Sequence, residues 1–290
     1  MKLVFLILNG MLSTLDTWSW PFALLVVSIL ILLVPAVSSS AKVRYYSCYI
    51  CYVFYVSLMG VLLAPYFLLK ARDITNLLLA GKILKNLTKF IGIKWTVRNE
   101  QILSKDRGAV ITANHQSILD VLGMFNIWEL MGMCTAVAKK EILYVPPFGI
   151  VAWLAGLVYI DRRNPESAIQ TLKHYSRLIH ELKAKLWLFP EGTRNKTGQQ
   201  LLPYKRGAFR MAIDAQAPII PVVFSPYYFI NGRNKTFDRG EIIISVLEEI
   251  PTVGLKPEDS NDLMKQVYEL MSKEYEKLKI EVEEKYQLKI

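Results

Sequence analysis

Cysteine is scarce in this sequence, which excludes the classes of protein that depend on it. Only three cysteines occur among 290 residues. That number cannot build the disulfide framework of a small secreted domain. Cys48 and Cys51 form a C-x-x-C pair, but no second pair is present to complete a four-ligand zinc site. Because the pair opens an apolar run, we interpret both residues as part of an apolar helix, and we expect no metal.

Acidic residues are outnumbered by basic ones, and this imbalance limits the choice of partner. The chain has 35 Lys and Arg against 25 Asp and Glu, a net charge of +10. Such a surface suits nucleic acid or the anionic headgroups and phosphates of lipids. The sequence has no zinc-finger, RRM or homeodomain signature, and an apolar N-terminal segment is unusual beside one. We therefore expect phosphate-bearing lipids as partners and no nucleic acid.

Charge is nearly absent from the N-terminal quarter of the chain, which contains two long apolar runs. Residues 21–37 include a single serine as their only polar side chain, and with two preceding tryptophans they reach about 20 residues, enough to cross a bilayer. A polar, basic turn at 38–44 separates them from a second uncharged run, 49–69. A cleaved signal peptide would come earlier and be shorter. The pattern predicts a hydrophobic helical hairpin that anchors residues 1–72 in a membrane.

The orientation of this anchor is indicated only by basic residues. Lys70 and Arg72 follow the second run directly, and Lys82 and Lys85 come soon after. An excess of Lys and Arg marks the cytoplasmic side of a membrane, so the body is expected to be cytosolic. A hairpin that dips into one leaflet would have the same sequence, and the choice between the two stays open.

After about residue 90 the pattern changes to short apolar, β-rich runs separated by helix-like stretches. The clearest helix is 165–184, and another is 206–216. This alternation predicts an α/β domain over residues 73–255, with a mixed, partly parallel sheet flanked by helices. Residues 256–290 are expected to form a charged amphipathic helix. The seven predicted strands are 93–98, 109–113, 134–138, 157–161, 186–190, 218–224 and 241–247.

One histidine stands where a catalytic base is expected. His115 follows the predicted strand 109–113 immediately, and Asp120 comes five residues later. If a helix starts near Ser117, its first turn brings the Asp120 carboxylate beside the imidazole. The carboxylate then fixes the tautomer and favours the imidazolium that forms when the histidine accepts a proton. Spacing alone favours a capped helix with a structural histidine over a catalytic base.

A second group of polar residues follows the predicted strand 186–190. The segment Glu191-Gly192-Thr193-Arg194 lies at the end of that strand. An arginine on a glycine-containing turn can bind a phosphate through two parallel hydrogen bonds. Glu191 could hold that arginine or receive a substrate hydroxyl. Taken by itself, the segment is also compatible with an ordinary turn.

Further basic residues follow two other predicted strands. Lys139 and Lys140 come after 134–138, and Arg162 and Arg163 come after 157–161. Each could be a solvated charge. Their repeated position at one edge of the sheet predicts a cationic pocket that faces His115.

Taken together, these segments resemble the glycerolipid acyltransferase family, and within it the 1-acylglycerol-3-phosphate acyltransferases. Residues 114–120 match the N-H-x-S-x-x-D block, and 189–194 match the F-P-E-G-T-R block. Residues 139–162 and 217–223 match the remaining two blocks. The resemblance covers about residues 70–255, and an N-terminal hairpin anchor is typical of the family.

The resemblance implies a reaction and a role for each residue. His115 would deprotonate the acceptor hydroxyl, with Asp120 as its orienting partner, and the oxygen would attack the acyl-CoA thioester directly. Arg194, with Glu191, Gly192 and Thr193, would bind the acceptor phosphate, and Lys139 and Arg162 would add positive charge. The implied substrates are acyl-CoA and lysophosphatidic acid, acylated at the sn-2 hydroxyl, without a cofactor or a metal. The implied location is the endoplasmic reticulum membrane.

Three alternatives remain at this point. The acceptor could be glycerol-3-phosphate or another lysophospholipid. The chain could hydrolyse acyl-CoA, or it could be a non-catalytic membrane-binding protein. The sequence predicts neither the preferred acyl-chain length nor the oligomeric state.

Overall fold

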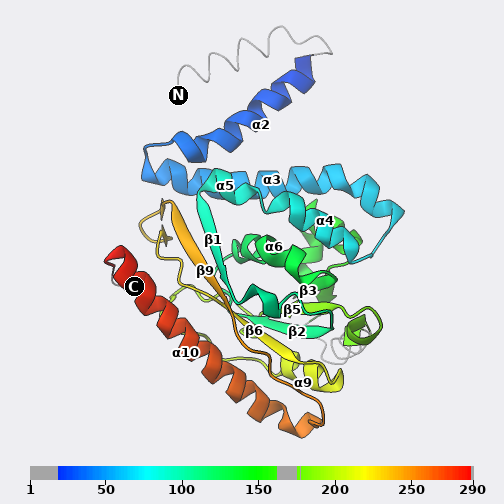
Figure 1. The fold of residues 1–290 in the computed structure, drawn as a ribbon. Helices are drawn as coiled ribbons and strands as arrows, with labels where there is room; N and C mark the ends of the chain where they lie inside the picture. Colours follow the sequence, from blue (N-terminus) through cyan, green and yellow to red (C-terminus); the bar gives the residue numbers. More distant parts are fainter. Residues whose placement is uncertain (1–18, 162–174, 177, 289–290) are drawn as a thin grey trace.

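A seven-stranded sheet forms the centre of the protein, whose computed structural model describes residues 19–161, 175–176 and 178–288 (Figure 1). The strand order is β1-β9-β6-β2-β5-β3-β4, and neighbouring strands are parallel except for β6 and β9. This confirms the predicted α/β fold with a mixed, mostly parallel sheet. The strands are β1 (Ile93–Arg98), β2 (Ala109–Ala113), β3 (Cys134–Lys139), β4 (Val158–Ile160), β5 (Lys185–Leu188), β6 (Ile219–Phe224) and β9 (Gly240–Val246).

The predicted strands agree closely with the observed ones. β1 and β2 begin and end at the predicted residues, and the other five differ by a few residues. β5 ends at Leu188 because Phe189 and Pro190 leave the sheet, and proline cannot donate a ladder hydrogen bond. A two-stranded hairpin, β7 (Ile230–Asn231) with β8 (Thr236–Phe237), was not predicted. Two-residue strands are too short to show an alternating pattern.

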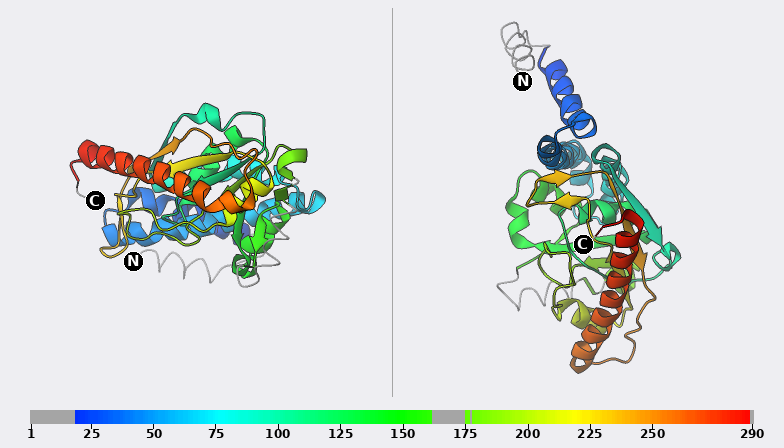
Figure 2. Two further views of the ribbon diagram at one scale, coloured as in Figure 1. Left: turned by 90° about the horizontal axis from the view of Figure 1, so that it is seen from below. Right: turned by 90° about the vertical axis from the view of Figure 1, so that its left-hand side faces the viewer.

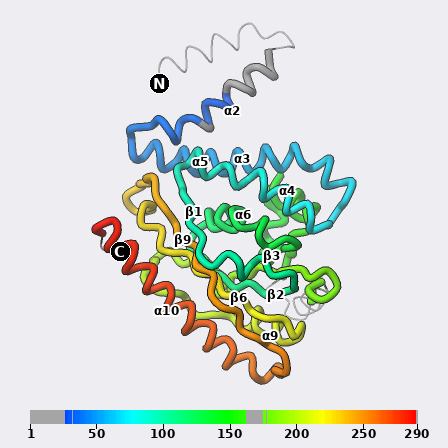
Figure 3. The backbone as a smooth tube through the Cα atoms, in the orientation of Figure 1, coloured from blue at the N-terminus to red at the C-terminus, as the bar shows by residue number. Residues whose placement is uncertain are grey.

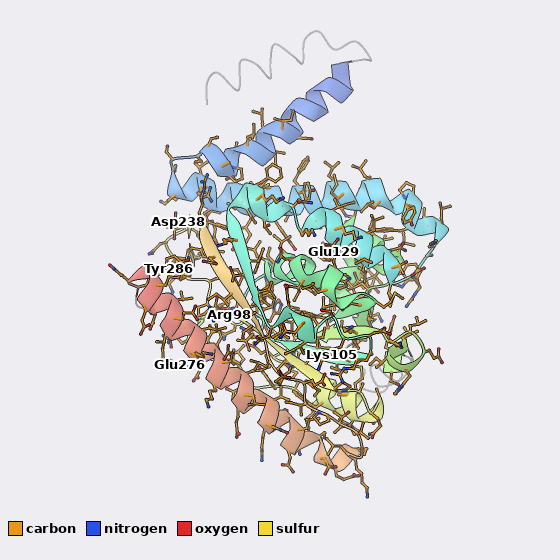
Figure 4. All side chains as sticks on the ribbon, in the orientation of Figure 1. Arg98, Lys105, Glu129, Asp238, Glu276 and Tyr286 are labelled. Atoms are coloured by element: carbon orange, nitrogen blue, oxygen red, sulfur yellow. The ribbon has the colours of Figure 1, made fainter. Side chains whose placement is uncertain are left out.

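Alternate residues of the strands enter two separate cores, one on each face of the sheet. Ile111 lies in the first core and its neighbour Val110 lies in the second. Figure 4 shows side chains filling the space between the sheet and the helices on both sides. The first core includes α4 (Thr75–Leu84), α5 (Leu87–Ile91), α6 (Asp120–Met131) and α7 (Phe148–Leu154), and the second includes α9 (Gly207–Asp214) and α10 (Ser260–Tyr286).

The C-terminal helix α10 runs diagonally across one face of the sheet (Figures 1 and 2). The expected helix at this end of the chain is therefore present. Its buried stripe recurs every three or four residues, as a one-sided helix requires. Arg98 of β1, which is labelled in Figure 4, donates two hydrogen bonds of 2.8 and 2.5 Å to Glu281 of α10. The stripe consists of Leu263, Val267, Met271, Tyr275, Leu278 and Val282.

Two other predicted helices have different outcomes. The helix expected at 206–216 is confirmed as α9. Of the helix expected at 165–184, residues 175–176 and 178–181 are helical. Its remaining part, 162–174 and 177, lies outside the described residues.

The N-terminal apolar runs form α2 (Ser19–Val37) and α3 (Ala41–Leu69). Within the described part of the chain, α3 is the one helix long and apolar enough to cross a membrane. The two helices pack against each other near the turn that joins them. Beyond it, α2 leads away from the body, whereas α3 lies along the body against α4, α7 and β8 (Figures 1 and 3).

Arg44 differs from its predicted position in the turn between the two apolar runs. It lies in the first turn of α3 and is only 8% exposed. Its guanidinium donates hydrogen bonds to the carbonyl oxygens of Phe237 at 2.7 Å and Ile91 at 3.0 Å, and to that of Pro35. A planar five-donor group suits several converging carbonyls, which sequence alone does not reveal. Arg44 therefore links the start of α3 to α2, α5 and β8 through hydrogen bonds.

Candidate active site

His115 and Asp120 lie side by side at the carboxyl end of β2. The imidazole Nδ1 of His115 is 2.7 Å from the Asp120 Oδ2. The connection between strand and helix is short, since β2 ends at Ala113 and α6 begins at Asp120. Asp120 is fully buried, and the His115 side chain is 21% exposed. With Nδ1 directed to the carboxylate, Nε2 is the ring nitrogen available to a substrate.

The chain around Asp120 fixes the position of its carboxylate. Oδ2 also accepts the backbone N–H groups of Gln116 at 2.7 Å and Ser117 at 2.9 Å. The acid stands at the first residue of α6, where the helix dipole favours a negative group. Tyr227 follows β6 and lies close enough to Asp120 to interact with its charge. Burial, and to a smaller extent the Asp120 charge, raises the pKa of the Tyr227 phenol well above its usual value. A neutral hydroxyl thus lies near the acid.

Phe189 and Glu191, both from the second predicted motif, hold His115 in place. Phe189 stacks on the imidazole, with ring centroids 4.2 Å apart and planes 19° from parallel. Glu191 accepts the backbone N–H of His115 at 2.8 Å through Oε1. Its Oε2 accepts the N–H of Leu202 at 3.3 Å. Glu191 is buried, and burial raises its pKa to about 7. The Glu191 side chain therefore connects the backbone at His115 with the backbone at Leu202.

The remaining residues of the Glu191–Arg194 segment form a tight turn. Gly192 has φ +70, and a Cβ there would lie 2.9 Å from the Lys205 Cε, so both conformation and space favour glycine. Thr193 and Arg194 are exposed beyond the turn. Asn195 then donates its N–H to the His115 carbonyl at 2.7 Å. A backbone hydrogen bond thus joins the first motif to the residue that directly follows the second.

A cleft of about 1210 Å³ opens beside this pair of motifs. One wall comes from the two predicted segments, through residues 116–118 and 194–199. The other wall was not predicted, because no motif marks it. It includes Tyr45 and Tyr49 of α3 and the hairpin residues 230–233. Arg194, Lys196 and Arg233 all line the cleft, which gives it a positive character.

Lys139, one of the cationic residues predicted after other strands, lies further from the cleft. Lys139 is exposed at the end of β3, at the same sheet edge as His115. β3 is two positions from β2 in the sheet, about 10 Å away. Lys139 is not among the residues that line the cleft. Arg162 lies outside the described residues.

Metal binding can be examined over the same part of the chain. Among the described residues, no group of three or more His, Cys, Asp or Glu side chains could hold a metal ion. Cys48 and Cys51 are buried on α3 and pack into the first core.

Comparison with known proteins identifies the family of this chain. The family model named Acyltransferase matches residues 94–225. The chain is 33% identical over 249 residues to 1-acyl-sn-glycerol-3-phosphate acyltransferase alpha from Homo sapiens, covering 84% of this chain and 87% of that protein. It is 36% identical over 244 residues to the Homo sapiens beta protein, covering 83% and 85%.

A solved structure shows the same fold. The 1-acyl-sn-glycerophosphate (LPA) acyltransferase PlsC from Thermotoga maritima is similar with a TM-score of 0.63 and 21% identity, over 87% of this chain and 96% of that chain. The sequence relatives are similar over most of their length, so the resemblance is not confined to the motifs. The chain belongs to the 1-acyl-sn-glycerol-3-phosphate acyltransferase family.

Proposed function

We propose that this protein transfers a fatty acyl group from acyl-CoA to the sn-2 hydroxyl of lysophosphatidic acid, giving phosphatidic acid. The observation that carries the proposal is the His115–Asp120 contact of 2.7 Å, directly next in the chain to Gln116 and Ser117, which line a cleft together with Arg194. A base at the edge of a cleft that holds a phosphate-binding cation is what a lipid that carries both a hydroxyl and a phosphate requires.

The chemistry follows from the position of the imidazole. Nε2 of His115 takes the proton of the acceptor hydroxyl as its oxygen attacks the thioester carbonyl carbon. The carbon–sulfur bond then breaks, and the imidazolium returns the proton to the departing CoA sulfur. Asp120, fixed by two backbone N–H groups, stabilises the imidazolium between these transfers. The products are the acylated lipid and CoA as a thiol, and the step requires no metal or other cofactor.

Ser117 is not needed as a nucleophile. Its Oγ accepts the Leu119 N–H at 3.2 Å, which is a capping contact at the start of α6. The chain also lacks a G-x-S-x-G elbow around this residue. Direct transfer without an acyl-enzyme is therefore the simpler route.

The phosphate of the acceptor is proposed to lie against Arg194, on the turn that Gly192 and Thr193 form. Lys196 and Arg233 line the same cleft and can share the negative charge. Glu191 supports this site from below through its contacts with the backbone. Lys139 and Arg162 are proposed to add positive charge further along the sheet edge.

The lipid substrates are proposed to enter from a membrane that α3 contacts. Large apolar side chains are exposed on α3, among them Ile50, Val53, Leu62 and Leu69. Because Tyr45 and Tyr49 of the same helix line the cleft, the reacting groups would lie close to the lipid surface. We propose an integral protein of the endoplasmic reticulum with a cytosolic body, supported by the basic residues after α3.

The decisive test is an acyl-transfer assay with lysophosphatidic acid and oleoyl-CoA, comparing wild type with His115→Ala. Loss of the base should lower turnover by about 10²–10⁴-fold while the unfolding temperature in detergent stays unchanged. His180→Ala is the matched control, because His180 is exposed on a helix of the second core. Full turnover in His115→Ala would exclude the proposed base.

Acceptor specificity is tested with the same purified protein. Glycerol-3-phosphate and other lysophospholipids should be acylated more slowly than lysophosphatidic acid. Release of CoA without any acceptor would indicate a hydrolase instead. Arg194→Lys should raise the KM for lysophosphatidic acid, because an ammonium cannot reproduce the two-pronged contact of a guanidinium.

A further inference from the structure

Tyr275 connects the C-terminal helix to the cleft, although it lies outside the residues that the family model matches. Its side chain is 1% exposed in the buried stripe of α10. The phenol donates a hydrogen bond to the Gly198 carbonyl at 2.7 Å and lies 3.4 Å from the Gln116 Oε1. Gln116, from the first predicted motif, and Gly198, from the loop after the second, both line the cleft. One buried hydroxyl thus contacts both of these parts of the cleft wall.

Residues 194–200, which we term the cleft loop, are held at two points. At the start, Asn195 donates its N–H to the His115 carbonyl at 2.7 Å. Asn195 also organises the loop itself, since its Oδ1 accepts the Thr197 N–H at 3.2 Å and the Thr197 hydroxyl at 2.8 Å. At the tip, Tyr275 supplies the bond to Gly198. Arg194 and Lys196 stand on this loop with exposed side chains, so the backbone decides where their charges lie.

Gln116, the second residue near the Tyr275 hydroxyl, is itself held in place by hydrogen bonds. Its Nε2 donates to the Ser225 carbonyl at 3.0 Å and the Phe224 carbonyl at 3.3 Å, at the end of β6. The residue is also the immediate neighbour of His115. Tyr275 therefore positions the tip of the cleft loop relative to the strand end that carries the base.

We propose that Tyr275 is a positioning residue for the acceptor phosphate, acting through the cleft loop and not through the base. This inference rests on the proposed function, since it assigns the loop cations to the phosphate of lysophosphatidic acid. The His115–Asp120 contact is made entirely within residues 115–120 and does not involve α10. Loss of the Tyr275 hydroxyl should therefore weaken acceptor binding and leave the proton-transfer step intact.

The test compares Tyr275→Phe with wild type. One hydrogen bond to a backbone carbonyl corresponds to about a two- to tenfold change, so the KM for lysophosphatidic acid should rise by that factor. The kcat and the KM for oleoyl-CoA should not change. Hydrogen exchange at the amides of residues 196–199 should become faster in the variant, a measurement that needs no substrate.

Tyr268→Phe is the matched control. Tyr268 lies on the same helix and donates the same kind of bond, at 3.1 Å, to the carbonyl of Leu201. Leu201 is buried and does not line the cleft. This variant should keep the wild-type KM and the wild-type exchange at 196–199.

Three outcomes would overturn the inference. These are an unchanged KM for lysophosphatidic acid in Tyr275→Phe, an equal rise in Tyr268→Phe, or a fall in kcat at constant KM. Each presumes that the wild type acylates lysophosphatidic acid. If the wild type does not, the proposed function fails, and faster loop exchange in Tyr275→Phe alone would still show the structural contact without its assigned role.

Discussion

Two long helices, α3 and α10, flank the sheet and differ mainly in what their outer faces present. They have 29 and 27 residues. Each buries one stripe, α3 in the first core and α10 in the second. Each also brings tyrosines to the cleft, since Tyr45 and Tyr49 line it and Tyr275 binds its loop. Each helix thus contributes to one core and to the surroundings of the cleft, although α3 packs on α4, α7 and β8, and α10 packs on β6 and α9.

Their outer faces are not alike. After Arg44, α3 has no charged residue as far as Leu69, and Val61 and Leu62 are more than half exposed. The outer face of α10 carries exposed charges such as Lys273 and Lys277. The buried stripe of each helix packs into a core of the protein. The polarity of the outer face determines whether that face is suited to lipid or to water.

The largest expected effect comes from placing a charge in a buried stripe. Val267 of α10 is fully buried, and Val267→Asp would leave a carboxylate without a partner in the second core. We expect a loss of roughly 3 kcal/mol or more in the free energy of unfolding. Thermal unfolding in detergent measures this, with exposed Gln266→Asp as a control that should stay within about 0.5 kcal/mol. Equal stability of the two variants would show that the stripe is not what docks α10.

A smaller effect is expected from charges on the outer face of α3. Val61→Asp with Leu62→Asp should reduce binding to liposomes by roughly tenfold or more, because one aspartate costs up to about 2.5–3.5 kcal/mol at the centre of a bilayer. Liposome flotation of the purified protein measures the bound fraction. Lys273→Asp with Lys277→Asp on α10 should not change it. Unaltered flotation of the α3 variant would contradict membrane contact through this face.

The smallest effect is expected at the ion pair that joins α10 to β1. The side chains of Arg98 and Glu281 are 37% and 34% exposed, so solvent screens their attraction. Glu281→Gln should lower the free energy of unfolding by about 0.2–1 kcal/mol, and less at high salt. Denaturant unfolding at two salt concentrations measures both values. A loss above about 2 kcal/mol would mean that the ion pair contributes more to docking than our comparison of the stripes implies.

Local patterns in the sequence predicted the parts of the fold that depend on neighbouring residues. β1 and β2 were predicted to the residue because each run is short and lies between a glycine and an asparagine, two residue types that are depleted in strands. The His115–Asp120 contact was predictable because the two residues are only five positions apart, between the end of a strand and the start of a helix. The helix itself begins at Asp120, three residues after the expected start near Ser117.

Residues that act through distant partners were not predictable in the same way. Glu191 belongs to a recognisable motif, but its contact with the His115 backbone joins positions 76 residues apart. Arg44 was assigned to a turn, and its partner Phe237 is 193 residues away. The sequence places Tyr275 only in an amphipathic helix, and its hydrogen bond to Gly198 is evident only from the structure. The roles of the site residues in catalysis remain predictions.

The sequence by itself determined the alternation of strands and helices, the apolar N-terminal segment, and the two motifs that contain His115 and Arg194. Each depends on residue type and spacing over a few turns or one strand. Only the tertiary structure decided the strand order, the burial of Arg44, and the outer wall of the cleft that α3 and the β7–β8 hairpin supply. These features depend on which surfaces meet, and many different sequences can satisfy the same contact.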